Sequence, residues 1–331
     1  MRRDDEDEPA AGAGPESATT GGAGGGGVTP TVTPTVTTAV TTAEALAAAA
    51  RALGAAGVPE ARREAGSLLA HATGRDRTYL LTHDDEPLSH EHLSAYREAV
   101  RRRAAGEPLQ YIRGSQEFYG LDFEVTPDVL IPRPETELLV ETALALTRGA
   151  AAPRFCDVGT GSGCVAVSLL NERPDARCIA VDISAAALAV ARRNAARHGV
   201  LGRLELLVSD CFDALAGRPP AGEQVPAEPF DLVASNPPYV AEDALAGLQR
   251  EVRDHEPRVA LTPGGDGLAV IRRLVSEAPR FVKPGGHLLM EIGYDQHERV
   301  ASLLDPGVWT LLDIRPDLQG IPRVVALRLG G

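Results

Sequence analysis

The sequence predicts an α/β protein in which a mostly parallel sheet of seven strands follows a small helical domain. Two observations favour this class. Apolar runs with strand character alternate with helix-forming runs over residues 136–331, and a glycine-rich turn joins the first of these strands to the next helix. The last two strands are hairpin-like, which adds one antiparallel strand. Open sheets of this kind bind ligands beyond the carboxyl ends of their strands.

The strand pattern gives the order of elements in this domain. The predicted strands are 154–157, 177–181, 203–209, 230–235, 287–292, 310–314 and 324–329. A helix is expected around 267–282, and the Pro- and Gly-containing segment 283–286 reads as a loop before the fifth strand.

Length and charge limit the possible functions. The 331 residues have room for two domains and a tail, and the net charge is −13. An acidic chain has no general attraction for nucleic-acid phosphates, so we expect no DNA partner. The sequence contains no apolar run of signal or membrane-spanning length, so we expect a cytoplasmic protein without a membrane partner. Residues 1–40 are of low complexity and are expected to be disordered.

Residues 41–105 are predicted to form a helical domain of three helices. Thr41 and Glu44 have the spacing of a capping box at the start of the first helix. Pro59 suits the first turn of the second helix, and Ser89 is placed to cap the third.

A β-hairpin linker is predicted for residues 106–135, with Gly114 and Gly120 flanking a β-prone aromatic pair. Prolines on both sides of Arg133 prevent regular helix at the end of this linker. The loop would therefore hold Arg133 and Glu135 in fixed positions facing a ligand.

The turn Asn236-Pro237-Pro238-Tyr239 follows the fourth strand and is the first candidate site. Two consecutive prolines remove two N–H donors, so the turn offers mainly acceptors, among them the Asn236 side-chain oxygen and the Pro237 carbonyl. An amide or an exocyclic amino group has two N–H donors that need such partners. Tyr239 supplies a flat face for a planar group. An ordinary proline-rich strand exit would have the same pattern, so the turn alone does not decide between the two.

A second candidate site follows the first strand of the sheet. It comprises Asp157, Gly159, Thr160, Gly161, Ser162 and Gly163. The glycines permit positive φ and let a ligand approach the backbone. Asp182 ends the next strand, where an acid can accept the ribose hydroxyls of an adenosine. Asp210 ends the third strand and could reach the adenine together with Cys211 and Phe212.

The glycine turn could hold NAD or S-adenosylmethionine, and three features favour the latter. Asp157 precedes the first glycine, where it would repel a pyrophosphate but tolerate a sulfonium-bearing amino acid. The third glycine follows the second after one residue, not two as in the dinucleotide fingerprint. Asn236 and its turn end a strand at the same edge of the sheet, beside the cofactor. A methyltransferase is therefore favoured well above a dehydrogenase.

Taken together, these residues resemble the HemK-type protein-(glutamine-N5) methyltransferases over about residues 42–330. The resemblance is strongest in 107–112, 117–120, 129–137, 157–163, 236–239 and 251–257. It implies a Rossmann-like methyltransferase domain, S-adenosylmethionine as donor with S-adenosylhomocysteine as product, and a helical domain that helps bind the substrate. The implied substrate is the glutamine of the Gly-Gly-Gln loop in peptide chain release factors, which act in translation termination.

The resemblance implies catalytic and substrate-binding roles for Asn236, Pro237, Pro238 and Tyr239, with Arg133 and Glu135 nearby. We expect no metal, and a monomer. Many relatives carry an aromatic residue in place of Cys211, so adenine stacking would either fall to Phe212 or be weaker. The alternative reading is an amino methyltransferase of DNA or ribosomal RNA bases, which share the Asn-Pro-Pro-Tyr turn; a binding module without catalysis is a third.

Overall fold

A computed structural model describes residues 39–216 and 228–331, and Val40–Gly331 forms one compact unit. Apart from its last two positions, the tail predicted at 1–40 lies outside the described residues. Within the described ranges, the longest helices are too short or too polar to cross a bilayer.

Helices come first along the described chain. They are α1 (Thr42–Ala55), α2 (Ala61–Thr73), α3 (Arg77–Thr82), α4 (His90–Ala104) and α5 (Leu109–Arg113). The capping box is confirmed: Thr41 Oγ1 accepts from the Glu44 amide at 3.2 Å, and the Glu44 carboxylate accepts from the Thr41 amide at 3.0 Å. Ser89 caps α4 as predicted, since its Oγ accepts from the His92 amide.

Two details of the helical prediction are wrong. The sequence pattern missed α3, which begins after Asp76, whose carboxylate accepts from the Tyr79 amide at 2.7 Å. Among the six residues of α3 only Leu80 is buried, so the helix has no apolar period that a sequence pattern could detect. Helix α2 starts at Ala61, two residues after Pro59.

The predicted hairpin is present. Strands β1 (Ser115–Phe118) and β2 (Leu121–Glu124) pair antiparallel around a turn at Tyr119 and Gly120. Phe118 and Phe123 are buried in the core beside the main sheet, which anchors the hairpin to it.

The main sheet has seven strands, as predicted. They are β3 (Arg154–Val158), β4 (Arg177–Asp182), β5 (Leu204–Val208), β6 (Phe230–Ser235), β7 (Val282–Glu291), β8 (Trp309–Pro316) and β9 (Pro322–Leu329). Their order is β5-β4-β3-β6-β7-β9-β8, and β9 runs antiparallel to both of its neighbours. The chain moves from β3 outward to β5 and returns to pair β6 on the other side of β3. The carboxyl ends of β3 and β6 therefore mark the point where the strand order reverses, the usual ligand site of such sheets.

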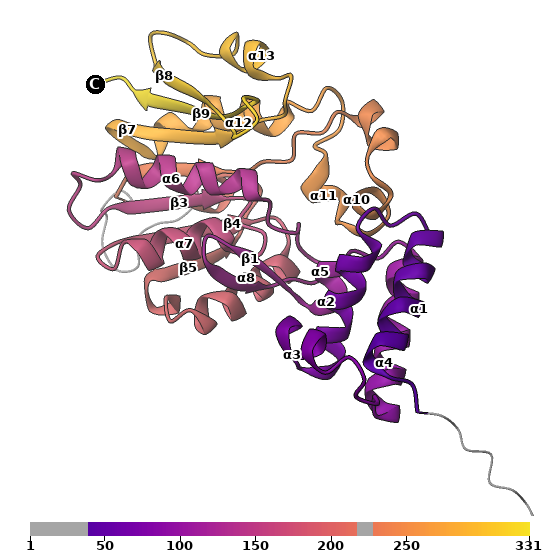
Figure 1. Cartoon of the computed structure of the whole chain (residues 1–331). Coiled ribbons are helices and arrows are strands. Elements are labelled where there is room, and N and C mark those ends of the chain that lie inside the picture. Colours follow the sequence, from indigo (N-terminus) through magenta and orange to yellow (C-terminus); the bar gives the residue numbers. More distant parts are fainter. Residues whose placement is uncertain (1–38, 217–227) are drawn as a thin grey trace, which may run out of the picture. The chain divides into compact units, whose positions relative to one another are not determined.

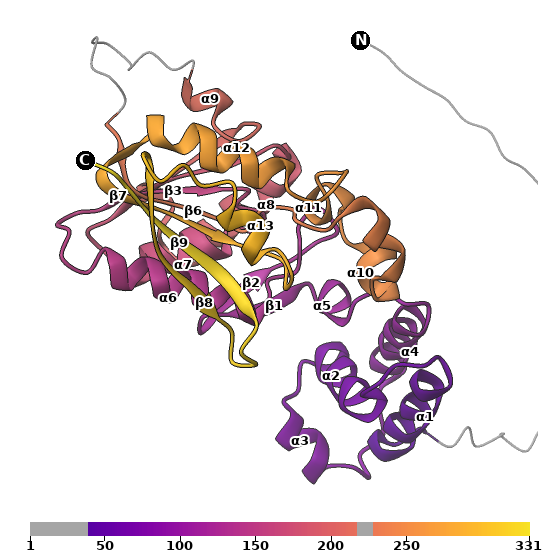
Figure 2. The same cartoon turned by 90° about the horizontal axis from the view of Figure 1, so that it is seen from above.

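Helices cover both faces of the sheet (Figures 1 and 2). Alternate strand residues enter opposite core layers, as Phe155 and Cys156 do. One layer packs on α6 (Glu137–Leu146), α7 (Cys164–Glu172) and α8 (Ala185–Arg197), the other on α12 (Ala269–Glu277) and α13 (His297–Ala301). The short elements are η1 (Pro134–Thr136), η2 (Leu201–Arg203), α9 (Asp213–Ala216), η3 (Glu242–Gly247), α10 (Arg250–His255), α11 (Arg258–Leu261) and η4 (Ala278–Arg280).

The predicted loop at 283–286 is instead part of β7, which begins at Val282. The pairing with β6 is irregular there: Phe230 pairs with Val282, whereas Leu232 pairs with His287. The extra residues of β7 form an irregularity that a Pro-Gly-Gly sequence tolerates. The Lys283 ammonium donates to Asp231 of β6 across this irregularity, at 2.8 Å.

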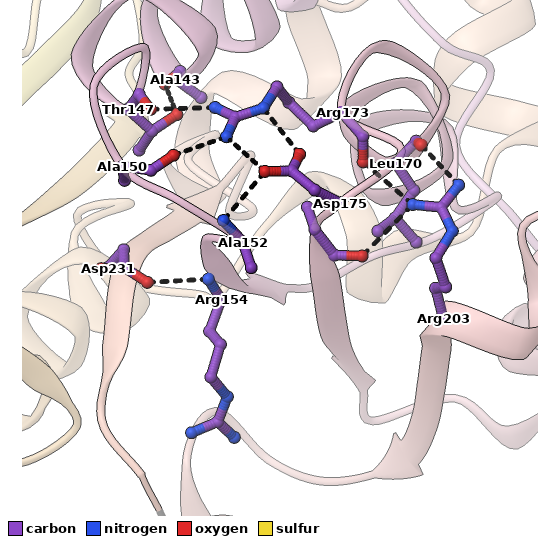
Figure 3. Close-up of polar contacts among 11 residues, drawn as sticks. Ala143, Thr147, Ala150, Ala152, Arg154, Leu170, Arg173, Asp175, Arg203 and Asp231 are labelled. Atoms are coloured by element: carbon purple, nitrogen blue, oxygen red, sulfur yellow. Dashed lines mark hydrogen bonds and ion pairs between the residues drawn. The ribbon is translucent and has the colours of Figure 1, made fainter.

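Two arginines satisfy carbonyl groups near the amino-terminal edge of the sheet (Figure 3). The Arg203 guanidinium donates to the carbonyls of Leu170, Arg173 and Ala176, at 2.7–3.2 Å. Arg173 donates to the carbonyl of Thr147 at 2.9 Å, and the carboxylate of Asp175 orients its guanidinium. The last carbonyl groups of a helix have no partner within the helix, and at the end of α7 Arg203 supplies donors for them.

We predict that Arg203→Ala lowers the free energy of unfolding by about 1–3 kcal/mol, because carbonyl groups of the α7–β4 connection lose their donor. Urea unfolding followed by circular dichroism measures the change. Arg192→Ala, on the exposed face of α8, is the matched control and should stay within about 0.5 kcal/mol of wild type. Equal losses in the two variants would contradict this role for Arg203.

Candidate active site

A cavity of about 200 Å³ lies at the carboxyl ends of the central strands. It brings together most of the residues that the sequence singled out. Those lining it are Arg133, Asp157, Gly159, Thr160, Gly161, Ser162, Asp182, Asp210, Cys211, Asn236, Pro237 and Pro238. Predicted residues that do not line it are Glu135, Gly163, Phe212 and Tyr239.

The glycine turn is shaped by backbone conformation. Gly159, Gly161 and Gly163 all have positive φ, at 76°, 55° and 82°. Gly163 is the N-cap of α7, and a Cβ there would lie only 3.1 Å from the Cβ of Ala191 on α8. The third glycine therefore permits close helix packing, whereas the first two border the cavity.

Asp157 is 1% exposed beneath this turn. Its Oδ2 accepts from the Thr160 hydroxyl at 2.7 Å and from the Ala166 amide at 3.2 Å. Burial raises the pKa of Asp157 to about 6, against the lowering effect of these hydrogen bonds. Within residues 39–216 and 228–331 no cation pairs with Asp157, and a buried carboxylate in that state favours a cationic ligand, such as the ammonium group of an amino acid.

Asp182 ends β4 and is held by backbone donors. Its two oxygens accept from the amides of Gly161 and Ser184, each at 2.9 Å. Burial raises the pKa of Asp182, although these bonds oppose the shift. Each oxygen keeps a lone pair for a ligand hydroxyl, so the residue fits a ribose. Asp157 and Asp182 are thus both hydrogen-bonded to the glycine turn, through Thr160 and Gly161 respectively.

The end of β5 differs from the sequence prediction. Cys211 lines the cavity with a φ of 48°, but Phe212 is 1% exposed in the core and stacks on Phe281 at 4.8 Å between ring centroids. Phe212 therefore has no access to an adenine. The Asp210 carboxylate is 2.8 Å from the Arg273 guanidinium, which orients it at the cavity wall.

The Asn-Pro-Pro-Tyr turn adjoins the glycine turn, because a Cβ on Gly159 would lie 3.9 Å from the Asn236 carbonyl oxygen. Asn236 Nδ2 donates to Thr136 Oγ1 at 3.0 Å, so its Oδ1 remains for a ligand in the cavity that Asn236 lines. The turn offers an acceptor at this position, as the sequence predicts.

Tyr239 lies behind this wall of the cavity. Its hydroxyl is 3.4 Å from a Glu291 carboxylate oxygen, and its carbonyl accepts from Gln296 Nε2 at 2.9 Å. Burial raises the pKa of the Tyr239 hydroxyl, so the group stays protonated. A Cβ on Gly267 would be 2.4 Å from the same carbonyl, and only glycine fits there. Sequence reasoning missed Thr136, Glu291 and Gln296, since polar residues in a loop and at a strand end have no distinguishing pattern.

Arg133 is held by an ion pair with Glu256, whose other oxygen accepts from the Ile131 amide at 3.2 Å. Burial raises the pKa of Glu256, and the Arg133 guanidinium opposes this shift. The pair fixes the loop before η1 against the segment after α10. Glu135 is half-buried on η1 and lies outside the cavity lining.

Comparison with known proteins identifies both parts of the chain. Residues 44–114 match the family model of the PrmC N-terminal domain, and residues 134–273 match that of the methyltransferase small domain. A solved methyltransferase structure from Pyrococcus furiosus is 17% identical, with a TM-score of 0.46, over 65% of this chain and 91% of that one.

Relatives named release factor glutamine methyltransferase match over nearly their whole length. The protein of Cereibacter sphaeroides is 47% identical over 85% of this chain and 96% of its own. That of Burkholderia pseudomallei is 49% identical over 80% and 90%, respectively. The chain belongs to the HemK/PrmC family of release factor glutamine methyltransferases.

Proposed function

We propose that this chain transfers a methyl group from S-adenosylmethionine to the side-chain amide nitrogen of the glutamine in the Gly-Gly-Gln loop of peptide chain release factors. The observation that carries the proposal is the position of Asn236. Its amide oxygen is available beside the glycine turn, in a chain that belongs to a glutamine methyltransferase family.

The cofactor roles follow from the contacts of each residue. Asp157 would hold the ammonium group, Asp182 the ribose hydroxyls, and the backbone of Gly159–Ser162 the remaining amino-acid portion. Asp210 and Cys211 would border the adenine. Gly163 would contribute indirectly, by allowing α7 and α8 to pack closely. Phe212 would contribute by packing on Phe281 in the core next to Cys211.

The chain's residues must make a poor nucleophile reactive. The amide lone pair is delocalised into the carbonyl, and the bound cofactor supplies a methyl group activated by its positive sulfur. Asn236 Oδ1 and the Pro237 carbonyl would each accept one N–H of the glutamine amide. These bonds enrich the nitrogen in electrons and stabilise the positive charge that develops there. Alignment of the reactants can supply roughly 7–11 kcal/mol of the barrier. The N–C bond forms as the S–C bond breaks, and the released proton goes to water.

Substrate recognition would involve both parts of the chain. Tyr239 would support the plane of the amide from behind Pro238, while Arg133 and Glu135 would contact the loop that carries the glutamine. We propose that residues 41–105 form a recognition domain, 106–135 a linker and 136–331 the catalytic domain. We further propose that the enzyme acts as a monomer in the cytoplasm. DNA is not expected as a partner, because a net charge of −13 gives no general attraction for phosphates.

The proposal is tested by incubating the full chain with labelled S-adenosylmethionine and a release factor, followed by mass-spectrometric mapping of the methylated residue. Methylation of the Gly-Gly-Gln glutamine is expected. Parallel reactions contain a release factor with that glutamine changed to alanine, duplex DNA or ribosomal RNA. Label in a nucleic acid, with none in the release factor, would refute the proposal in favour of base methylation.

Asn236→Ala is predicted to lower kcat at least about 100-fold, because the amide loses an acceptor that positions it. Affinity for S-adenosylhomocysteine should change by less than about threefold, since the cofactor's main partners are elsewhere. Steady-state kinetics and calorimetry measure the two quantities. Asn171→Ala on the exposed side of α7 is the control. Near-normal turnover by Asn236→Ala would remove this residue from the chemistry.

Asp182→Asn is predicted to weaken cofactor binding about 10–100-fold, as expected when charged hydrogen bonds to two hydroxyls are lost. Calorimetric titration with S-adenosylhomocysteine gives the dissociation constant. Asp243→Ala, at an exposed position on η3, should bind like wild type. A wild-type constant for Asp182→Asn would show that the ribose lies elsewhere.

Cofactor affinity should depend on pH through Asp157. Because its pKa in the free protein is about 6, the carboxylate predominates above pH 6 and the neutral acid below it. Binding of an ammonium group requires the carboxylate, so affinity for S-adenosylhomocysteine should fall as pH drops, by up to about tenfold per unit below 6. Asp157→Asn should bind weakly and show no inflection near pH 6. An unchanged inflection in that variant would assign the effect to another group.

A further inference from the structure

A chain of hydrogen bonds runs from Asn236 into the protein interior. Asn236 Nδ2 donates to Thr136 Oγ1 at 3.0 Å, and the Thr136 hydroxyl donates to Glu291 Oε2 at 2.6 Å. The Tyr239 hydroxyl is 3.4 Å from Glu291 Oε1. The members come from η1, from the carboxyl end of β7 and from the turn after β6. Thr136 and Glu291 are each only 2% exposed, so water does not compete for these bonds.

The single hydroxyl proton of Thr136 determines which group donates and which accepts in each of these hydrogen bonds. A threonine hydroxyl has one proton to donate, and Thr136 gives it to the Glu291 carboxylate. In its hydrogen bond with Asn236, the Thr136 oxygen can therefore act only as the acceptor. The Asn236 amide must therefore turn its NH₂ to Thr136, and its oxygen is left for the cavity. The rotated amide would place two acceptor oxygens, Asn236 Oδ1 and Thr136 Oγ1, against each other, which costs a buried hydrogen bond.

We propose that Thr136 and Glu291 are positioning residues that hold the Asn236 oxygen toward the methyl-accepting nitrogen, an inference that rests on the proposed function. The substrate nitrogen carries N–H donors, so an Asn236 turned the other way would present donors to donors. Thr136 lines the cavity together with Asn236, whereas Glu291 does not. Both act through the orientation of Asn236.

The charges around Glu291 make this orientation sensitive to pH. Thr136 and Glu135 face it from η1, Tyr239 from the turn and Arg323 from β9. The Arg323 guanidinium is also bound to Asp317, at 3.0 Å. Burial raises the pKa of Glu291 to about 7, and Glu135 adds to this, while the Thr136 bond and Arg323 lower it. A protonated Glu291 can donate to Thr136, which frees the Thr136 proton for Asn236 Oδ1. The hydrogen bonds from Asn236 through Thr136 to Glu291 therefore keep this direction above pH 7 and lose it below pH 7.

The test compares Thr136→Val, Thr136→Ser and Glu291→Gln with wild type in full-length protein, at saturating S-adenosylmethionine and with a release factor as acceptor. Thr136→Val should lower kcat about 100-fold, the cost of a misplaced reactant. Thr136→Ser keeps the hydroxyl and should stay within about threefold of wild type. The kcat of wild type should fall as pH drops through 7, and this limb should be absent in Glu291→Gln.

Several results would overturn the proposal: normal turnover by Thr136→Val, equal losses in Thr136→Ser and Thr136→Val, or an unchanged acid limb in Glu291→Gln. Thermal melting and calorimetric cofactor binding identify a variant that fails to fold, and the Thr136 pair remains decisive if Glu291→Gln does so.

A second measurement does not depend on methyl transfer. In protein with ¹⁵N-labelled asparagine, the Asn236 side-chain NH₂ signal is assigned by its loss in Asn236→Asp. Its hydrogen exchange should be about tenfold slower in wild type and Thr136→Ser than in Thr136→Val. Equal exchange rates would refute the hydrogen-bond chain. Wild-type protein that fails to methylate a release factor would instead refute the proposed function, with the exchange result still deciding the role of Thr136.

Discussion

The parallel pairing of β3 with β6 is the constraint on which the site depends. Val158 is in register with Ser235, and the Ser235 hydroxyl donates to the Val158 carbonyl at 2.7 Å. Both strands therefore end at the same level, one at the glycine turn and the other at Asn236. Residues almost 80 positions apart in sequence are brought together by this register, and a slip of one residue would reverse which side chains face each core layer.

Three buried acids lie in this part of the protein, and their hydrogen-bond partners differ: Asp157 and Asp182 line the cavity, whereas Glu291 does not. Asp157 has neutral donors and a raised pKa, so it favours a cation. Asp182 is fixed by two backbone amides and keeps acceptor sites for hydroxyl groups. Glu291 accepts hydrogen bonds from the Thr136 and Tyr239 hydroxyls, so its charge orders neighbouring side chains. Burial alone would have made these carboxylates alike; the arrangement of donors separates them.

Sequence patterns predicted the features that depend on neighbouring residues. The capping box at Thr41, the hairpin, the seven strands and the glycine turn all follow from local period or composition. Features set by distant contacts were missed. Phe212 has the residue type for adenine stacking, but its ring packs on Phe281 from another element. The partnership of Thr136 with Glu291 joins residues 155 positions apart, which no local pattern encodes.

The same contacts limit which side chain the turn can accept. The two prolines have no N–H, the Asn236 NH₂ is used by Thr136, and the Tyr239 hydroxyl is directed to Glu291. One N–H of Asn236 and the Tyr239 hydroxyl are thus engaged within the protein, and the Asn236 oxygen and the Pro237 carbonyl are acceptors for the ligand. A carboxamide satisfies those acceptors with its two N–H groups. A carboxylate of the same shape would bring only acceptors and a negative charge. Its oxygens and the acceptor oxygens of the turn would then be left without donors, and this cost, more than size, should distinguish glutamine from glutamate.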